Sequence, residues 1–295
     1  MEKKTAWVLS GGGSLGAVQV GMLQALARAG MVPDLVIGAS VGALNGAFYA
    51  ASPSREGVDR LAEVWSGLMR RDVFPLTLWA GLKALLLHRD HFVEATRLHA
   101  LIRRALAIER VEQARIPLHI VATNALSGAE VVLASGAVDT ALLASTAIPV
   151  VFPHVRLDGR YLVDGGVSSN TPIATAVRLG AQRIIVLPTG TTCAATEPPS
   201  DMAALALHML SLLSMRQLDR DVQIYANQAR ISIVPPLCPL SVSVFDFTQT
   251  AGLIERSARQ TDEWLAGGGL EHTGPLHVPL AHHHRPRVPA GAAVG

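Results

Sequence analysis

The sequence has few of the residues that mark several classes of protein. It holds only two cysteines, Cys193 and Cys238, among 295 residues, so it contains neither a disulfide framework nor a CxxC pair. Charged residues make up 16% of the chain, and the formal net charge is +2. Without a long run of Lys and Arg, the chain lacks the basic surface that nucleic-acid binding requires. We therefore expect ordinary reduced thiols and no nucleic-acid partner.

Long hydrophobic runs are also absent. The stretch over 203–213 is interrupted by His208 and is shorter than the roughly 20 apolar residues of a spanning helix. Lys3 and Lys4 precede a short apolar run that ends at a cluster of glycines, whereas a signal peptide needs an apolar run of roughly 7–15 residues. We therefore expect a cytoplasmic protein without a signal peptide or transmembrane segment, and leave peripheral contact with a membrane open.

What the sequence does have is an ordered alternation of apolar strands and helices. The pattern predicts a strand over 6–9, a helix over 17–29, a strand over 35–37 and a helix over 43–51. Units of this kind build parallel sheets covered by helices. Further strands are predicted over 118–122, 131–133, 161–163, 184–187 and 231–234, and helices over 138–144, 201–228 and 247–265. We therefore predict an α/β fold with a mostly parallel central sheet.

Residues 55–110 are predicted to be mostly helical. They contain an apolar cluster made of Trp79, Leu82, Leu85, Leu86 and Leu87. The cluster could pack on the sheet, form a lid over an apolar substrate, or rest on a bilayer, since cationic residues flank it. The sequence leaves these alternatives open.

The character of the chain changes near its C-terminus. Three consecutive glycines begin at Gly267, and three consecutive histidines, proline and alanine follow. Such a composition is typical of a flexible segment. Because no linker or repeat precedes it, we predict one domain over 1–266 and a flexible tail over 267–295.

A strained serine turn is the first candidate for chemistry. Gly38-Ala39-Ser40-Val41-Gly42 has the form G-x-S-x-G between a predicted strand and a predicted helix. In that context the serine hydroxyl stands out at the carboxyl edge of a sheet, and the glycines let the backbone bend sharply. The alternative is that Ser40 merely caps the helix. We interpret Ser40 as a nucleophile and Gly38 and Gly42 as the glycines of its elbow.

A glycine-rich loop over 11–16 follows the first strand. It matches G-x-G-x-x-G, the fingerprint of dinucleotide-binding proteins, which predicts a nucleotide-dependent oxidoreductase as an alternative. That fingerprint needs an acidic residue at the end of the second strand, where this chain has Ser40, and Asp34 comes too early. The backbone amides of such a loop can instead hold an oxyanion. The candidate donors are Gly11, Gly12, Gly13 and Ser14.

A third segment offers a carboxylate. Asp164-Gly165-Gly166 follows a predicted strand and a hairpin turn at Asp158-Gly159. A carboxylate at a strand end, with glycines that let other backbone approach, suits a buried catalytic base. Alone the tripeptide is weak evidence, because similar tripeptides are common in turns.

Taken together, these segments resemble the patatin-like phospholipase family. The loop over 11–16, the elbow over 38–42 and the turn over 164–166 are similar to three of that family's blocks, and 144–153 is similar to a fourth. The resemblance covers roughly residues 5–190. It implies a three-layer α/β/α fold and a lipid acyl hydrolase without metal or cofactor. It also implies a Ser–Asp dyad of Ser40 and Asp164, with the loop amides as oxyanion hole and a lipid or fatty-acyl ester as substrate.

One position departs from that family. Many members carry Arg or Lys where this chain has Leu15. Since the oxyanion donors are backbone groups, Leu15 is compatible with catalysis, although any role of a cation at this point is lost.

Two further alternatives remain open from the sequence. A Ser–His–Asp triad would need a histidine base, and the histidines at positions such as 119, 154 and 208 have no distinctive context. A non-catalytic lipid-binding module on the same fold is the other alternative, and the presence of both Ser40 and Asp164 counts against it.

Overall fold

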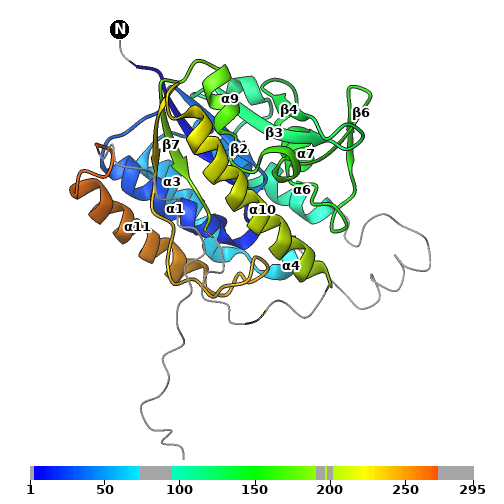
Figure 1. Cartoon of the computed structure of the whole chain (residues 1–295). Helices are drawn as coiled ribbons and strands as arrows, with labels where there is room; N and C mark the ends of the chain where they lie inside the picture. The colour runs from blue at the N-terminus through cyan, green and yellow to red at the C-terminus, as the bar shows by residue number, and fades with distance from the viewer. Residues whose placement is uncertain (1–2, 74–94, 191–196, 198–201, 272–295) are drawn as a thin grey trace, which may run out of the picture.

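The structure is a computed structural model that describes residues 3–73, 95–190, 197 and 202–271 (Figure 1). The apolar cluster predicted within 79–87, Cys193 and the part of the predicted tail from 272 onward lie outside the described residues. The division into a domain over 1–266 and a tail therefore stays a prediction.

A mixed sheet forms the centre of the molecule. Its strands are β1 (Thr5–Leu9), β2 (Leu35–Ala39), β3 (Leu118–Asn124), β4 (Glu130–Leu133), β5 (Val155–Leu157), β6 (Arg160–Asp164), β7 (Arg183–Leu187) and β8 (Arg230–Ile233). The order across the sheet is β5-β6-β3-β2-β1-β7-β8, and β4 pairs with β3. The strands β3, β2, β1, β7 and β8 run parallel, while β4, β5 and β6 join antiparallel. The predicted mostly parallel sheet is confirmed.

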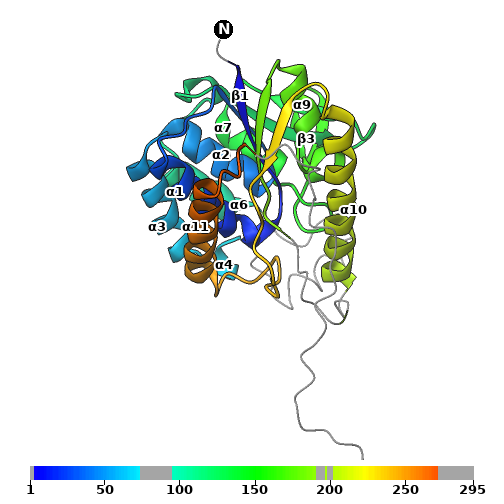
Figure 2. The ribbon, with the colours of Figure 1, turned by 60° about the vertical axis from the view of Figure 1, so that its left-hand side comes forward.

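Helices cover both faces of this sheet. They are α1 (Gly16–Arg28), α2 (Val41–Ala51), α3 (Arg55–Gly67), α4 (Arg70–Val73), α6 (Thr96–Ala105), α7 (Val138–Ser145), α8 (Gly166–Ser169), α9 (Ile173–Arg178), α10 (Met202–Tyr225) and α11 (Thr250–Ala266). Short 3₁₀ turns, η1 (Gly13–Leu15) and η2 (Val111–Gln113), complete the described elements. Figure 2 shows α1, α3 and α11 on one side of the sheet and α10 on the other.

The alternation of side chains along β1 explains the three layers. Trp7 and Leu9 point into a core shared with α1, α2, α3 and α11, whereas Ala6 and Val8 point into a second core under α9 and α10. Successive side chains of a strand face opposite sides, so a strand that is apolar at every position requires cover on both. The three-layer α/β/α prediction is therefore confirmed.

Most predicted elements occur within a few residues of their expected bounds. The long helix predicted over 201–228 is α10, and the helix predicted over 247–265 is α11. The helical region predicted over 55–110 is divided, within its described residues, into α3, α4 and α6. The strand β5, which pairs with β6 across the hairpin turn at Asp158 and Gly159, was not predicted.

Candidate active site

The candidate nucleophile lies where β2 meets α2. Ser40 has φ 54°, a conformation that non-glycine residues rarely adopt, and such strain is typical of a nucleophile elbow. The two glycines of the elbow are needed for close packing. A Cβ on Gly38 would lie 2.4 Å from the carbonyl oxygen of Gly42, and a Cβ on Gly42 would lie 2.3 Å from the carbonyl oxygen of Leu9. The tight contact of α2 with the ends of β1 and β2 therefore holds Ser40 in this conformation.

Asp164 ends β6 and meets Ser40 directly. The hydroxyl of Ser40 donates to Oδ2 of Asp164 at 2.6 Å, and the N–H of Gly166 donates to Oδ1 at 2.7 Å. Both Ser40 and Asp164 are buried. Burial, partly opposed by the two hydrogen bonds, raises the pKa of Asp164 to about 6. The structure thus brings together two residues that lie 124 positions apart in the sequence.

The main chain of the elbow is held by a buried serine. Ser145, at the end of α7, accepts a hydrogen bond from the N–H of Ser40 at 2.9 Å and donates its own to the carbonyl of Val121 at 2.6 Å. A buried N–H without a partner is unfavourable, so this contact supports the strained turn. The sequence singled out the segment around Ser145 but gave this residue no role.

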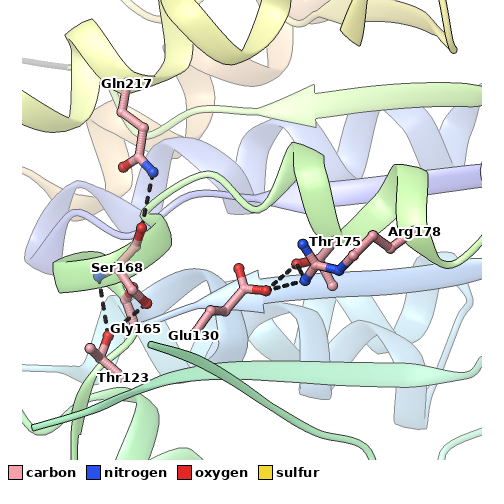
Figure 3. Close-up of polar contacts among 7 residues, drawn as sticks. All are labelled: Thr123, Glu130, Gly165, Ser168, Thr175, Arg178 and Gln217. Atoms are coloured by element: carbon pink, nitrogen blue, oxygen red, sulfur yellow. Dashed lines mark hydrogen bonds and ion pairs between the residues drawn. The ribbon is translucent and has the colours of Figure 1, made fainter. Parts of the chain in front are cut away.

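A chain of hydroxyl contacts fixes the backbone around Asp164. The hydroxyl of Thr123 on β3 donates to the carbonyl of Asp164 at 2.8 Å and accepts from the N–H of Ser168 at 3.1 Å. Gln217 of α10 in turn donates to the carbonyl of Ser168 at 3.0 Å (Figure 3). Helix α8, which begins two residues after Asp164, is therefore tied both to β3 and to α10.

A second cluster in the same view ties β4 to α9. Glu130 accepts from the hydroxyl of Thr175 at 2.6 Å and forms an ion pair with Arg178 (Figure 3). These contacts stabilise the face of the sheet that carries α8 and α9, and their residues lie outside the lining of the cavity beside Ser40.

The glycine loop passes directly beside Ser40. A Cβ on Gly11 would lie 3.1 Å from the Cβ of Ser40. The N–H of Gly11 donates to the carbonyl of Asn170, and the N–H of Ser14 donates to the carbonyl of Val244. Among the residues that the structure describes, the N–H groups of Gly12 and Gly13 have no hydrogen-bond partner. Two of the four predicted amides are therefore already engaged, and two remain available to a ligand.

Asn170 and Thr189 hold this loop from the other side. The side chain of Asn170 donates to the carbonyl of Gly11 at 3.4 Å, and the hydroxyl of Thr189 donates to the same carbonyl at 2.8 Å. Thr189 also packs against Gly12, where a Cβ would lie only 2.2 Å from its hydroxyl oxygen. The sequence singled out Asn170 only as part of a cap for the following helix and did not single out Thr189. Their contacts with the loop were missed because the fold brings them there from distant parts of the chain.

A cavity of about 160 Å³ opens beside these groups. Ser40, Asp164, Gly12 and Gly13 all line it. The rest of its wall is mostly apolar and includes Leu15, Ile148, Pro149, Val167, Leu210, Met215, Leu218, Ile233, Leu237, Val244 and Phe245. Leu15 is fully buried and belongs both to the wall of the cavity and to the core.

The described histidines lie away from the cavity. None of the described residues that line the cavity is a histidine. His99 pairs with Asp139 at 2.8 Å between α6 and α7, and His154 packs against Tyr161. Burial lowers the pKa of His119, which sits within β3. Within residues 3–73, 95–190 and 202–271, no group of three His, Cys, Asp or Glu side chains is placed to hold a metal ion.

The end of β2 bears on the dinucleotide alternative. Its last residue, Ala39, is followed directly by Ser40, at the place where a dinucleotide site needs a carboxylate for the ribose. The loop amides face the cavity that contains Ser40 and Asp164. This arrangement is typical of acyl-transfer hydrolases, in which a serine at an elbow lies beside free backbone amides.

Comparison with known proteins agrees with this class. The family model described as patatin-like phospholipase matches residues 7–177. The chain belongs to the patatin-like phospholipase family, and the resemblance drawn from its motifs is confirmed.

The curated relatives are longer proteins. An uncharacterized NTE family protein of Mycobacterium tuberculosis is 31% identical over 185 residues, which cover 62% of this chain and 48% of that protein. Patatin-like phospholipase domain-containing protein 7 of Rattus norvegicus is 29% identical over 195 residues, which cover 63% of this chain and 13% of that protein. The chain therefore spans about half the length of the mycobacterial relatives it matches.

Two solved structures align with most of the chain. VipD from Legionella pneumophila has a TM-score of 0.47 at 15% identity, covering 90% of this chain and 67% of that one. Human GIVD cytosolic phospholipase A2 has a TM-score of 0.49 at 11% identity, covering 91% of this chain and 59% of that one.

No helix of the described residues combines the length and apolar character needed to cross a membrane.

Proposed function

We propose that this chain is a serine acyl hydrolase that cleaves fatty-acyl esters of phospholipids or related lipids. The observation that carries the proposal is the 2.6 Å hydrogen bond from the strained Ser40 to Asp164. It lies in an apolar cavity beside the unpaired amides of Gly12 and Gly13. The family to which the chain belongs supports a lipid as substrate.

The first half of the reaction forms an acyl-enzyme. Asp164 takes the proton of Ser40 as the hydroxyl oxygen attacks the ester carbonyl carbon. The carbonyl oxygen becomes an oxyanion, which the N–H groups of Gly12 and Gly13 stabilise, worth roughly 3–4 kcal/mol per donor. As the tetrahedral intermediate collapses, the alcohol leaves and receives the proton from Asp164.

The second half restores the enzyme. Asp164, again ionised, takes a proton from a water molecule that attacks the acyl carbon. The same two amides hold the second oxyanion. When it collapses, Ser40 leaves with the proton held by Asp164, and the fatty acid is released.

The environment of Asp164 supports its role as base without a histidine. An aspartate in water is a weak base, but burial raises the pKa of Asp164 to about 6, closer to neutral pH. At pH 7 the group is still mostly ionised and can accept a proton. We therefore expect kcat/KM to increase with pH through about 6 and to level off above it.

The wall of the cavity supports an apolar acyl group as the bound part of the substrate. Met215, Leu218 and Leu237 lie on it together with the residues of the glycine loop. Apolar walls with a few polar groups at one end are typical of sites that bind the chain of a lipid and orient its ester.

The test is labelling with a fluorescent fluorophosphonate, which reacts with activated serines. We expect wild type to be labelled and Ser40→Ala to be unlabelled, while Ser66→Ala, which removes an exposed serine outside the cavity, is labelled like wild type. Labelling of folded Ser40→Ala at the rate of wild type would contradict the proposal. Absence of labelling in every protein would favour a binding role, and bound cofactor absorbance would then test the nucleotide alternative.

A further inference from the structure

Exposed apolar side chains lie on α10, a helix that also lines the cavity. Leu205, Met209 and Leu213 are spaced four residues apart and therefore share one side of the helix. Met209 is 43% and Leu213 is 65% exposed. The adjoining side of the same helix, at Leu210 and Ser214, lines the cavity. Whatever contacts the outer side of this part of α10 therefore also lies next to the cavity.

The loop after α7 presents another exposed apolar side chain next to residues that line the same cavity. Ile148 and Pro149 line the cavity, and Val151 and Phe152 are buried in the core. Val150 between them is 54% exposed and has φ 73°, which is a strained conformation for a β-branched residue. Strain of this kind persists only where the surrounding structure imposes it, and it is frequent at functional sites. Here it holds an apolar side chain out in solvent.

These residues form what we call the rim patch. It consists of Val150, Val167, Leu205, Met209, Leu212 and Leu213, all of which are exposed. All parts of the rim patch are next to the cavity. Val167 lines the cavity itself, Pro149 lines it next to Val150, and Leu210 lines it next to Met209. Soluble proteins rarely expose a large group of apolar side chains without a partner. Here the group lies next to residues that line a mostly apolar cavity.

Cationic side chains flank the rim patch. Arg216 and Arg220 continue the exposed side of α10, while Asp219 and Asp221 of the same helix are half-buried. The guanidinium of Arg70 lies 5.7 Å from the ring centre of Phe245, which lines the cavity. An apolar surface bordered by arginines matches a bilayer with anionic head groups, where the apolar side chains enter the acyl boundary and the cations meet phosphates.

We propose that the rim patch docks the protein onto a lipid surface with anionic head groups, so that the mouth of the cavity faces that surface. The route of substrate from the surface into the cavity rests on the proposed function. The docking itself needs neither Ser40 nor Asp164. The proposal assigns membrane contact to α10 and the loop at 148–153, whereas the sequence offered it for the cluster within 79–87 as one of three open alternatives.

The test compares substitutions in the rim patch on α10 with a substitution near the C-terminal end of the same helix. We would measure co-sedimentation of the full chain with vesicles of phosphatidylcholine and phosphatidylglycerol. Met209→Ser/Leu213→Ser should lower partitioning roughly tenfold or more, since two apolar side chains no longer leave water. Ile224→Ser, which changes a 48% exposed residue near the far end of the same helix, should bind like wild type. Wild type, Met209→Ser/Leu213→Ser and Ile224→Ser should all hydrolyse a soluble short-chain ester at equal rates.

Val150→Gly gives a second readout, because it removes an apolar tip and relieves strain. We expect it to raise the melting temperature and to weaken vesicle binding several-fold, so a simple loss of folding cannot explain the result.

Two results would overturn the proposal: vesicle binding by Met209→Ser/Leu213→Ser as strong as that of wild type, or no vesicle binding by wild type. So would a wild-type dimer that this variant converts to a monomer, since the patch would then join two copies. Vesicle binding by a wild type without esterase activity would sink the proposed function and leave the docking intact.

Discussion

The two sides of the site are held in place by different kinds of contact. Ser40 is fixed mainly by main-chain packing, since the glycines of its elbow press against each other and against the end of β1, with one supporting hydrogen bond to Ser145. Asp164 is fixed by hydrogen bonds from hydroxyl groups on separate elements, among them Thr123 and the hydroxyl of Ser40 itself. Where packing leaves no free space, even one added methyl group displaces the main chain. Where several hydrogen bonds hold a group, removal of one of them weakens the arrangement only in part. The two sides should therefore respond differently to substitution.

Replacement of the base should have the largest effect. Asp164→Asn keeps the shape of the side chain but cannot accept the proton of Ser40, so we expect kcat to fall by roughly 10³–10⁴-fold. The measurement is hydrolysis of a short-chain p-nitrophenyl ester, with Asp262→Asn as control, which alters a surface ion pair with Arg28. Residual activity above one tenth of wild type in Asp164→Asn would show that another group acts as base.

The glycine loop should tolerate even one added methyl group poorly. In Gly12→Ala the new Cβ would lie 2.2 Å from the hydroxyl oxygen of Thr189, so the loop must shift and its free amide moves away from the oxyanion. We expect kcat to fall by roughly 10²–10³-fold with little change in KM, as for loss of one oxyanion donor. Gly252→Ala is the control, because a Cβ there meets nothing within 4 Å. An unchanged kcat in a folded Gly12→Ala protein would exclude this amide as a donor.

The buried carboxylate of Asp164 should also make the free energy of unfolding depend on pH. Because the pKa of Asp164 is raised to about 6, its contribution to stability is present below pH 4 and is lost as pH rises through 6. Asp164→Asn does not titrate. Between pH 4 and pH 8 the difference in unfolding free energy should therefore shift in favour of the variant by up to about 3 kcal/mol. Chemical denaturation at both pH values measures it, and a shift toward wild type would mean that the carboxylate is stabilised by a partner.

How much of the site could be predicted from the sequence depends on whether its parts lie close together along the chain. The elbow at Ser40 and the glycine loop are local, because their strands, glycines and helices follow one another along the chain, so the sequence could predict where both segments lie. It could not predict which amides of the loop are free. The antiparallel strand that brings Asp164 to Ser40 obeys no local rule, so that pairing came from resemblance to a family.

The supporting residues show where sequence reasoning ends. Ser145, Asn170 and Thr189 are ordinary polar residues whose partners are main-chain groups of segments far away in the chain. A single serine or asparagine carries no periodicity or spacing that reveals such a partner. For the same reason, the engagement of the amides of Gly11 and Ser14 by Asn170 and Val244 could not be read from the loop itself.

The smallest effect should come from the hydroxyl of Ser145, which joins the elbow at Ser40 to β3. Ser145→Ala leaves the N–H of Ser40 and the carbonyl of Val121 without their buried partner, so the elbow should relax from its strained conformation. We expect kcat to fall about tenfold with KM nearly unchanged, since Ser145 positions the nucleophile and touches no substrate.

Ser257→Ala is the matched control, because this buried serine also donates to a main-chain carbonyl, that of Val18, and does not line the cavity. Both variants should lose similar stability, roughly 1–3 kcal/mol, but only Ser145→Ala should lose activity and fluorophosphonate reactivity. Equal activity in the two variants would mean that glycine packing alone holds Ser40, and that the hydrogen-bonded side of the site serves Asp164 only.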